Sequence, residues 1–236
     1  MLARLVVCFW VLGGMALADM SHGSTAATYD VRLLGVKVGQ MAMAGRVKKN
    51  AYVVKSEFST KGLVGTMARA SFDLQSRGRV KNDAFQPTYY SEDINTGRRQ
   101  SSARLVYTNG VPEVAGGTLA AEDDLLDPRT EKGTLDPLSG MFFAMRDQHP
   151  DEVCKVGVTV FDGARRSRFE MTERIETDTG FHCTGAYRRI AGFSDRELKR
   201  QTVFPVAVDY RFKGEVLQAV RVEVRSVYGK AVLVRR

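Results

Sequence analysis

The chain has 236 residues, of which 44% are hydrophobic, 26% charged and 9% aromatic. This composition is too apolar for a disordered chain and too even for a fibrous one, so it predicts a globular protein. Lys and Arg number 35 against 27 Asp and Glu, with only three His and three Cys. A basic chain of this length buries enough surface to fold without a metal or cofactor, and we expect neither.

The first 18 residues have the pattern of a secretory signal peptide. Arg4 precedes an apolar run from Leu5 to Leu17, and Ala16-Leu17-Ala18 forms an A-x-A cleavage site before Asp19. The run is shorter than the roughly 20 apolar residues of a membrane span. We therefore predict cleavage after residue 18, export to the bacterial periplasm, and one β-rich domain over residues 19–236 that does not span the membrane.

Alternation of apolar and polar residues dominates the first half of the mature chain and predicts strands. In the segment Ala51–Ser59, for example, Tyr52 and Val54 fall on one face while Lys55 and Glu57 fall on the other. The strands expected from this pattern are Tyr29–Leu33, Gln40–Ala44, Ala51–Ser59, Thr66–Leu74 and Arg98–Tyr107.

The centre of the chain predicts a loop followed by one amphipathic helix. Residues 119–133 are acidic and lack alternation, which is typical of a surface loop rather than of a cation site, because the spacing of the acids is not that of a Ca²⁺ loop. Asp136-Pro137 then supplies an N-cap and a first-turn proline for a helix over about 137–147. Its apolar stripe of Leu138, Met141, Phe142 and Met145 is expected to face the sheet.

The C-terminal half again alternates. Asp162-Gly163 predicts a hairpin turn, and Ser194 with Glu197 has the spacing of a capping box for a short helix. The expected strands are Val153–Phe161, Arg166–Ile175, Val203–Phe212, Val216–Val227 and Ala231–Val234, with Val216, Val220, Val222 and Val224 sharing one face of the fourth. About ten to twelve strands with one helix predict a mainly β protein, a curved antiparallel sheet forming a half-open barrel or spiral that the helix plugs or covers.

Export leaves Cys154 and Cys183 as the two thiols of the mature chain, and a disulfide between them is the natural expectation in an oxidising compartment. A redox site is the alternative, but no C-x-x-C motif is present. In a plain meander the two cysteines would lie on strands two places apart, nearly 10 Å from each other. A disulfide tolerates less than about 7 Å between Cα atoms, so the bridge predicts an irregularity at Cys154 or strong twist of the sheet.

Several segments resemble a family of exported bacterial proteins known as domain of unknown function 3108. They are Leu135–Ser139, Val160–Arg166, Cys183–Gly192, Phe204-Pro205 and Tyr228-Gly229. The resemblance implies a periplasmic β protein, similar to the spiral or half-barrel proteins that support cell-envelope integrity and more distantly to lipoprotein carriers. It implies no reaction, because the family has no assigned active site.

No catalytic or metal-binding constellation is visible in the sequence. His22, His149 and His182 are scattered without metal-ligand spacing, and the serines lack nucleophile motifs. His182 next to Cys183 would matter only if that thiol were free. We therefore expect a protein that is not an enzyme, and export excludes nucleic acid as a partner.

Two functions remain open. The first is a non-catalytic envelope protein that binds an envelope polymer, lipid or partner protein in support of envelope integrity, with candidate anion-binding residues Arg165, Arg166, Arg168, Arg188 and Arg189. These arginines can equally be solvated residues that form cross-strand ion pairs. The second is a carrier of a lipid or acyl chain in a groove between the concave sheet and the helix, with candidate groove residues Leu138, Met141, Phe142 and Met145. Core filling is the alternative for the methionines.

Overall fold

A computed structural model describes residues 24–62, 69–121, 125–227 and 229–236 of the chain. Thirteen strands in these ranges form one sheet with the order β7-β6-β5-β4-β3-β2-β1-β13-β12-β11-β10-β9-β8, and every neighbouring pair is antiparallel. The strands are β1 Thr25–Leu33, β2 Val36–Lys48, β3 Ala51–Thr60, β4 Ser71–Lys81, β5 Ala84–Asn95, β6 Gln100–Thr108, β7 Val111–Gly116, β8 Gly157–Phe161, β9 Arg166–Thr177, β10 Gly180–Ala191, β11 Val203–Lys213, β12 Val216–Ser226 and β13 Gly229–Arg235.

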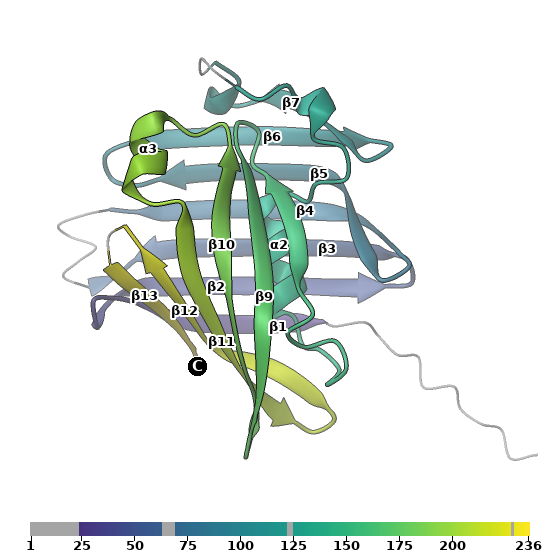
Figure 1. Ribbon diagram of the computed structural model, residues 1–236, viewed down its shortest axis with the longest axis vertical. Coiled ribbons are helices and arrows are strands. Elements are labelled where there is room, and N and C mark those ends of the chain that lie inside the picture. Colours follow the sequence, from purple (N-terminus) through teal and green to yellow (C-terminus); the bar gives the residue numbers. More distant parts are fainter. Residues whose placement is uncertain (1–23, 63–68, 122–124, 228) are drawn as a thin grey trace, which may run out of the picture.

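The sheet folds over on itself. In Figure 1 the strands β1 to β6 run across the back of the molecule, whereas β9 to β11 run nearly perpendicular to them at the front. The pairing of β1 with β13 joins these two halves into one continuous sheet. The mainly β architecture predicted from the sequence is confirmed, and the sheet is a barrel that does not close.

The gap between the edge strands β7 and β8 is covered by backbone rather than by strand pairing. The amide of Gly133 donates to the carbonyl of Gly110 in the β6–β7 turn, over 2.8 Å. Two residues later Leu135 pairs with β8: its amide donates to the carbonyl of Thr159, and its carbonyl accepts from the amide of Phe161. These bonds satisfy edge groups that would otherwise be exposed to other chains.

The helix α2 (Pro137–Met145) lies inside the folded sheet, between its two halves (Figure 1). The Asp136 carboxylate caps it by accepting from the amide of Ser139 at 2.8 Å, and Pro137 occupies the first turn, as the sequence predicted. The helix ends at Met145, two residues earlier than expected. Six of its nine residues are buried, because the sheet surrounds the helix. The sequence predicted burial of a single stripe only.

Shorter elements complete the fold. Where a loop was expected over residues 119–133, the chain forms two 3₁₀ turns, η1 (Thr118–Ala121), which begins one residue earlier, and η2 (Pro128–Thr130). Residues 122–124 lie outside the described part. The helix α3 (Asp195–Arg200) has the predicted capping box. Among the described residues, no helix has the length and apolarity to cross a bilayer.

Three predictions of strand structure need correction. The strand β8 begins at Gly157 instead of Val153, because the preceding residues form a turn around Cys154. In β12 a bulge at Val220 reverses the alternation, so Leu217 and Ala219 are buried while Val216 is exposed. The strands β5 and β7 were not anticipated. The predicted strand Thr66–Leu74 falls partly on residues 63–68, which lie outside the described residues, as does the signal peptide.

Candidate functional site

A cavity of about 340 Å³ lies between α2 and the inner face of the second half of the sheet. Every strand from β8 to β13 contributes to its wall, which is mainly aliphatic: Val160, Val206, Val208, Val222, Val224 and Leu233. Only four of its lining residues carry polar side-chain groups. The volume falls within the range of small-molecule pockets, which are typically about 300–1,000 Å³ and mostly apolar.

The helix contributes Met141 and Met145 to the cavity, together with Gly140 and Ala144. Gly140 lets the helix approach β8 closely, since a Cβ there would come within 3.1 Å of the Val160 side chain. Of the four predicted groove residues, the two methionines therefore line the cavity. Leu138 and Phe142 are fully buried and do not line the cavity. The four residues expected to line one groove therefore lie on two different sides of the helix.

The opposite side of α2 packs closely against the first half of the sheet. The rings of Phe142 and Phe85 are 5.8 Å apart, and Phe85 stacks on Tyr52 at 4.5 Å. Gly45 on β2 makes this approach possible, because a Cβ there would lie only 2.5 Å from the Phe142 ring. Aromatic rings therefore pack closely against the helix on this side.

A buried polar network sits at the start of α2. The Asp136 carboxylate accepts hydrogen bonds from the hydroxyls of Ser139 at 2.6 Å and Ser76 at 2.8 Å, and Ser139 also pairs with the hydroxyl of Tyr52 at 2.6 Å. Burial raises the pKa of Asp136 to about 6, although these hydrogen bonds oppose the shift. The network fastens the helix to β3 and β4, and its polar groups are satisfied internally.

The polar part of the cavity lining gathers around the β8–β9 turn. The Asp162 carboxylate accepts from the amides of Ala164 at 2.9 Å and Arg165 at 2.7 Å, which fixes it in the turn. On the adjoining strands the hydroxyls of Ser167 and Tyr187 lie 2.6 Å apart. Arg165 completes the polar set of the lining.

A second carboxyl group lies near this turn. Burial raises the pKa of Glu92 on β5 to about 7, with Asp162 raising it further and Arg165 opposing the shift. The hydroxyl of Tyr90 donates to Glu92 at 2.5 Å. The region around the turn therefore brings together carboxyl groups from both halves of the sheet.

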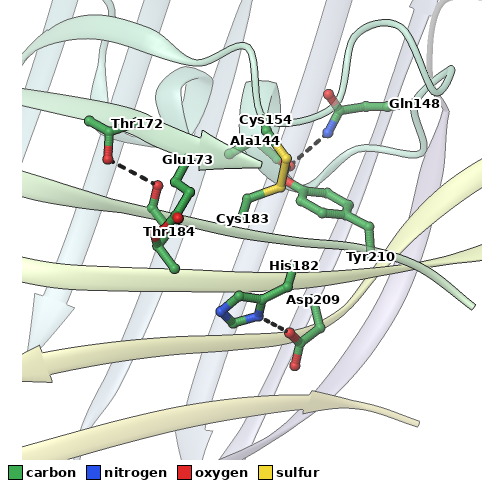
Figure 2. The surroundings of a disulfide bond; sticks show 10 residues. All are labelled: Ala144, Gln148, Cys154, Thr172, Glu173, His182, Cys183, Thr184, Asp209 and Tyr210. Atoms are coloured by element: carbon green, nitrogen blue, oxygen red, sulfur yellow. Dashed lines mark hydrogen bonds and ion pairs between the residues drawn. A yellow bond between two sulfur atoms is a disulfide. The ribbon is translucent and has the colours of Figure 1, made fainter. Parts of the chain in front are cut away.

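The predicted disulfide is present between Cys154 and Cys183, with a Cα–Cα distance of 5.6 Å (Figure 2). The predicted irregularity is also found: Cys154 lies outside β8 with a φ of 65°, which few non-glycine residues adopt. The bridge anchors the segment after α2 to β10. Nearby, the hydroxyl of Tyr210 and the amide of Gln148 both donate to the carbonyl of Ala144 in the last turn of α2 (Figure 2).

The candidate anion-binding arginines contact protein groups. Arg166 pairs with the buried Glu131 at 3.1 Å, and Arg168 and Arg188 both pair with Glu170. Arg189 donates to two backbone carbonyls, those of Glu197 and Gln201. Arg165 belongs to the cavity lining, and its guanidinium lies over the Phe193 ring, as does that of Arg189. Binding of an external anion by any of the five stays a prediction.

His182 forms a pair with Asp209 at 2.6 Å between the imidazole Nδ1 and the carboxylate. Figure 2 shows this pair on the side of the strands opposite the disulfide, as the alternation of side chains along β10 requires. It therefore does not contact the cysteines. Within the described ranges, no three His, Cys, Asp or Glu side chains form a group that could hold a metal ion.

Sequence reasoning missed Ser167, Tyr187 and Asp162 as cavity residues. The alternation of β9 and the position of Asp162 before Gly163 indicated a hairpin, but they did not indicate that the hairpin borders a cavity. The pairing of Ser167 with Tyr187 depends on the register of β9 with β10, which is interrupted twice by bulges. No local pattern reports such a register.

The fold and cavity together define an open, barrel-like β protein with an internal apolar site. The chain belongs to the family described as protein of unknown function (DUF3108), whose model matches residues 28–233. A search of curated protein sequences finds no match. Among solved structures, the chain is similar to a protein from Brucella abortus described as a beta-barrel-like protein of domain of unknown function DUF1849. The TM-score is 0.50 at 12% sequence identity, over 92% of this chain and 97% of that one.

Proposed function

We propose that this protein is a non-catalytic periplasmic protein of the cell envelope that binds a single acyl chain of an envelope lipid in the cavity beside α2. The observation that carries the proposal is the apolar cavity itself, walled by six strands and closed on the other side by the helix. Such a site removes apolar surface of a ligand from water at roughly 25 cal/mol per Å².

The volume favours one chain over two. An apolar cavity of about 150 Å³ stays dry and binds benzene, and the present cavity has a volume of about 340 Å³. On that scale it holds roughly a dozen carbon atoms, which is one medium-length acyl chain or the end of a longer one. Met141 and Met145 suit such a ligand, because unbranched thioether side chains adapt to chains of different length and bend.

The chemistry of the rest of the chain supports the envelope setting. A disulfide is stable in an oxidising compartment such as the periplasm, and the first 18 residues have the pattern of an export signal. In that compartment the abundant acyl chains belong to membrane lipids and lipoproteins. Sequestering or delivering them would support envelope integrity without a chemical reaction.

Binding can be tested on the mature chain, purified without detergent, with the neutral dye N-phenyl-1-naphthylamine and its displacement by monododecanoylglycerol. We expect dye fluorescence to rise on binding, and the lipid to reverse the rise with a 1:1 stoichiometry. Val206→Phe and Val224→Phe each place a ring in the cavity and should weaken dye binding at least about 10-fold, the equivalent of 1.4 kcal/mol.

Val203→Phe is the matched control, since Val203 lies at the start of β11 with 38% of its surface exposed and does not line the cavity. Its dye affinity should equal that of the wild type. Folding of each variant is checked by thermal unfolding. If the dye fails to bind the wild type, or if both cavity variants fold and bind it as tightly as the wild type, the cavity is not a ligand site.

A further inference from the structure

We propose that the cavity selects acyl chains whose head is neutral and hydrogen-bonding, such as an ester, an amide or a glycerol hydroxyl, over chains that end in a carboxylate or phosphate. This inference rests on the proposed function and names its ligand class. Three features of the lining carry it: where the polar groups lie, their charge, and their hydrogen-bonding capacity.

The polar lining residues occupy one region, and this sets the orientation of a bound chain. Asp162 and Arg165 flank the β8–β9 turn, while Ser167 and Tyr187 follow on β9 and β10. The walls from β11, β12 and β13 contribute only aliphatic side chains to the cavity. A bound amphiphile therefore places its hydrocarbon against β11–β13 and α2, and its head against the β8–β9 turn.

The charges around that turn disfavour an anion. Arg165 is the one cation of the lining, and it shares the region with the Asp162 carboxylate, which two backbone amides hold in place. The neighbouring ionisable groups are Glu92, Glu197 and Arg189, which interact electrostatically with Arg165, Tyr187 or each other. Two cations thus lie near three carboxyl groups, of which Glu92 has a pKa raised to about 7. A carboxylate or phosphate head would enter a region without excess positive charge, and its desolvation would not be compensated.

The hydroxyl pair supplies what a neutral head needs. Ser167 and Tyr187 lie 2.6 Å apart, and one of the two hydroxyls donates to the other. The second hydroxyl keeps its hydrogen, and both oxygens keep lone pairs, so the pair can donate once and accept as well. An ester carbonyl accepts the remaining hydrogen, and a glycerol hydroxyl donates to a lone pair. A carboxylate would accept the same hydrogen but would bring its charge next to Asp162.

The test compares two heads on one chain. Monododecanoylglycerol and dodecanoate carry the same hydrocarbon, and each is titrated at pH 7.5 against the dye-loaded mature protein. We expect the glyceride to bind about 10-fold more tightly, because a factor of this size corresponds to one or two neutral hydrogen bonds. Because the free heads differ in hydration, the decisive reading is how variants change the ratio of the two affinities.

Asp162→Asn keeps the oxygen that accepts the turn amides but removes the charge, and should strengthen dodecanoate binding several-fold while glyceride binding stays constant. The double substitution Ser167→Ala with Tyr187→Phe should weaken glyceride binding about 3- to 10-fold. Asp209→Asn is the matched control, because Asp209 pairs with His182 on the opposite side of the strands from the disulfide. Its ratio should equal that of the wild type.

The outcomes separate the two proposals. If neither the dye nor either amphiphile binds, the proposed function fails. If both amphiphiles bind, but Asp162→Asn and the hydroxyl variant leave the affinity ratio unchanged, the acyl-chain site stands and the neutral-head assignment is wrong. A wild-type protein that binds dodecanoate more tightly than the glyceride overturns the assignment as well.

Discussion

The two sides of α2 differ in how the same helix is packed. Toward the first half of the sheet, Phe142 packs on Gly45 and lies tilted beside the Phe85 ring, and the Asp136 network ties the helix to β3 and β4. Toward the second half, Met141 and Met145 face valines across a cavity of about 340 Å³. One side is built from rings that interlock, and the other from short branched side chains that leave space between them.

The first half of the sheet packs closely along α2, whereas the second half fixes the helix at its C-terminal end, where Tyr210 donates to the carbonyl of Ala144. The remainder of that second side can therefore stay incompletely filled. An unfilled apolar volume weakens packing by about 24 cal/mol per Å³ when it arises by truncation. A fold that keeps such a volume must obtain its stability elsewhere. In this molecule the aromatic packing, the buried polar network and the disulfide are the elements that provide it.

The largest expected change in stability comes from truncating a side chain of α2, and two separate variants, one on each side of the helix, are compared. Phe142→Ala should lower the free energy of unfolding by about 3–5 kcal/mol, because it opens a void in close-packed surroundings. Met141→Ala should cost only about 1–2 kcal/mol, because the side chain already faces open space. Urea denaturation of both variants measures the difference. Equal losses would show that the two sides of α2 are packed equally closely.

The disulfide fastens the segment after α2 to the second half of the sheet. Replacing both Cys154 and Cys183 by Ala should lower the free energy of unfolding by up to about 3.6 kcal/mol, the chain-entropy value for a loop of about 30 residues. Reduction of the wild-type protein should give a similar loss, and the double variant should no longer respond to reductant. A wild type whose urea midpoint is insensitive to reductant would contradict this role.

A smaller effect is expected from pH, through a group that lies between the halves. Burial raises the pKa of Glu92 to about 7 in the folded protein, above the value of about 4.5 expected when it is unfolded. The folded state therefore binds this proton more tightly, so the contribution of Glu92 to stability is greatest below pH 4.5 and is lost as the pH rises through 7. The loss amounts to at most about 3 kcal/mol.

Glu92→Gln should remove this part of the pH dependence, so that the variant gains stability relative to the wild type as the pH rises from 4.5 to 8. Asp136, whose pKa burial raises to about 6, is present in both proteins, so the difference between their profiles reports the titration of Glu92 together with its coupling to Asp136. The exposed Glu113 on β7 provides the control substitution Glu113→Gln, which should leave the pH profile unchanged. Parallel profiles for Glu92→Gln and the wild type would show that the group is not titrating in this range.

Much of the fold was predictable because its signals are local. The alternation in Ala51–Thr60 placed Tyr52 and Val54 on the buried face, and Asp136-Pro137 marked the start of α2 within one residue. The pair Cys154 and Cys183 followed from the count of thiols that remain if the predicted signal peptide is removed. Each of these signals lies in a few neighbouring residues or in a simple count.

The errors share a different origin. The bulge at Val220 reversed the faces of β12. The bulge is defined by how β12 pairs with β11, so the sequence of β12 alone does not indicate it. The stripe of Leu138, Met141, Phe142 and Met145 was expected to face one surface, whereas sheet on both sides divides it. Of the candidate site, the sequence therefore identified the two methionines but not Ser167, Tyr187 or Asp162.

Alternation and capping are local patterns and the thiols can simply be counted, so the sequence alone was enough to predict a strand-rich domain with one central helix and one cysteine pair. The folded chain adds three features that no local pattern contains: the sheet turns back over the helix, side chains from six strands line a cavity, and carboxyl groups from both halves meet near its polar end. These features depend on the register and curvature of strands far apart in sequence, which are set by the summed packing of the whole sheet.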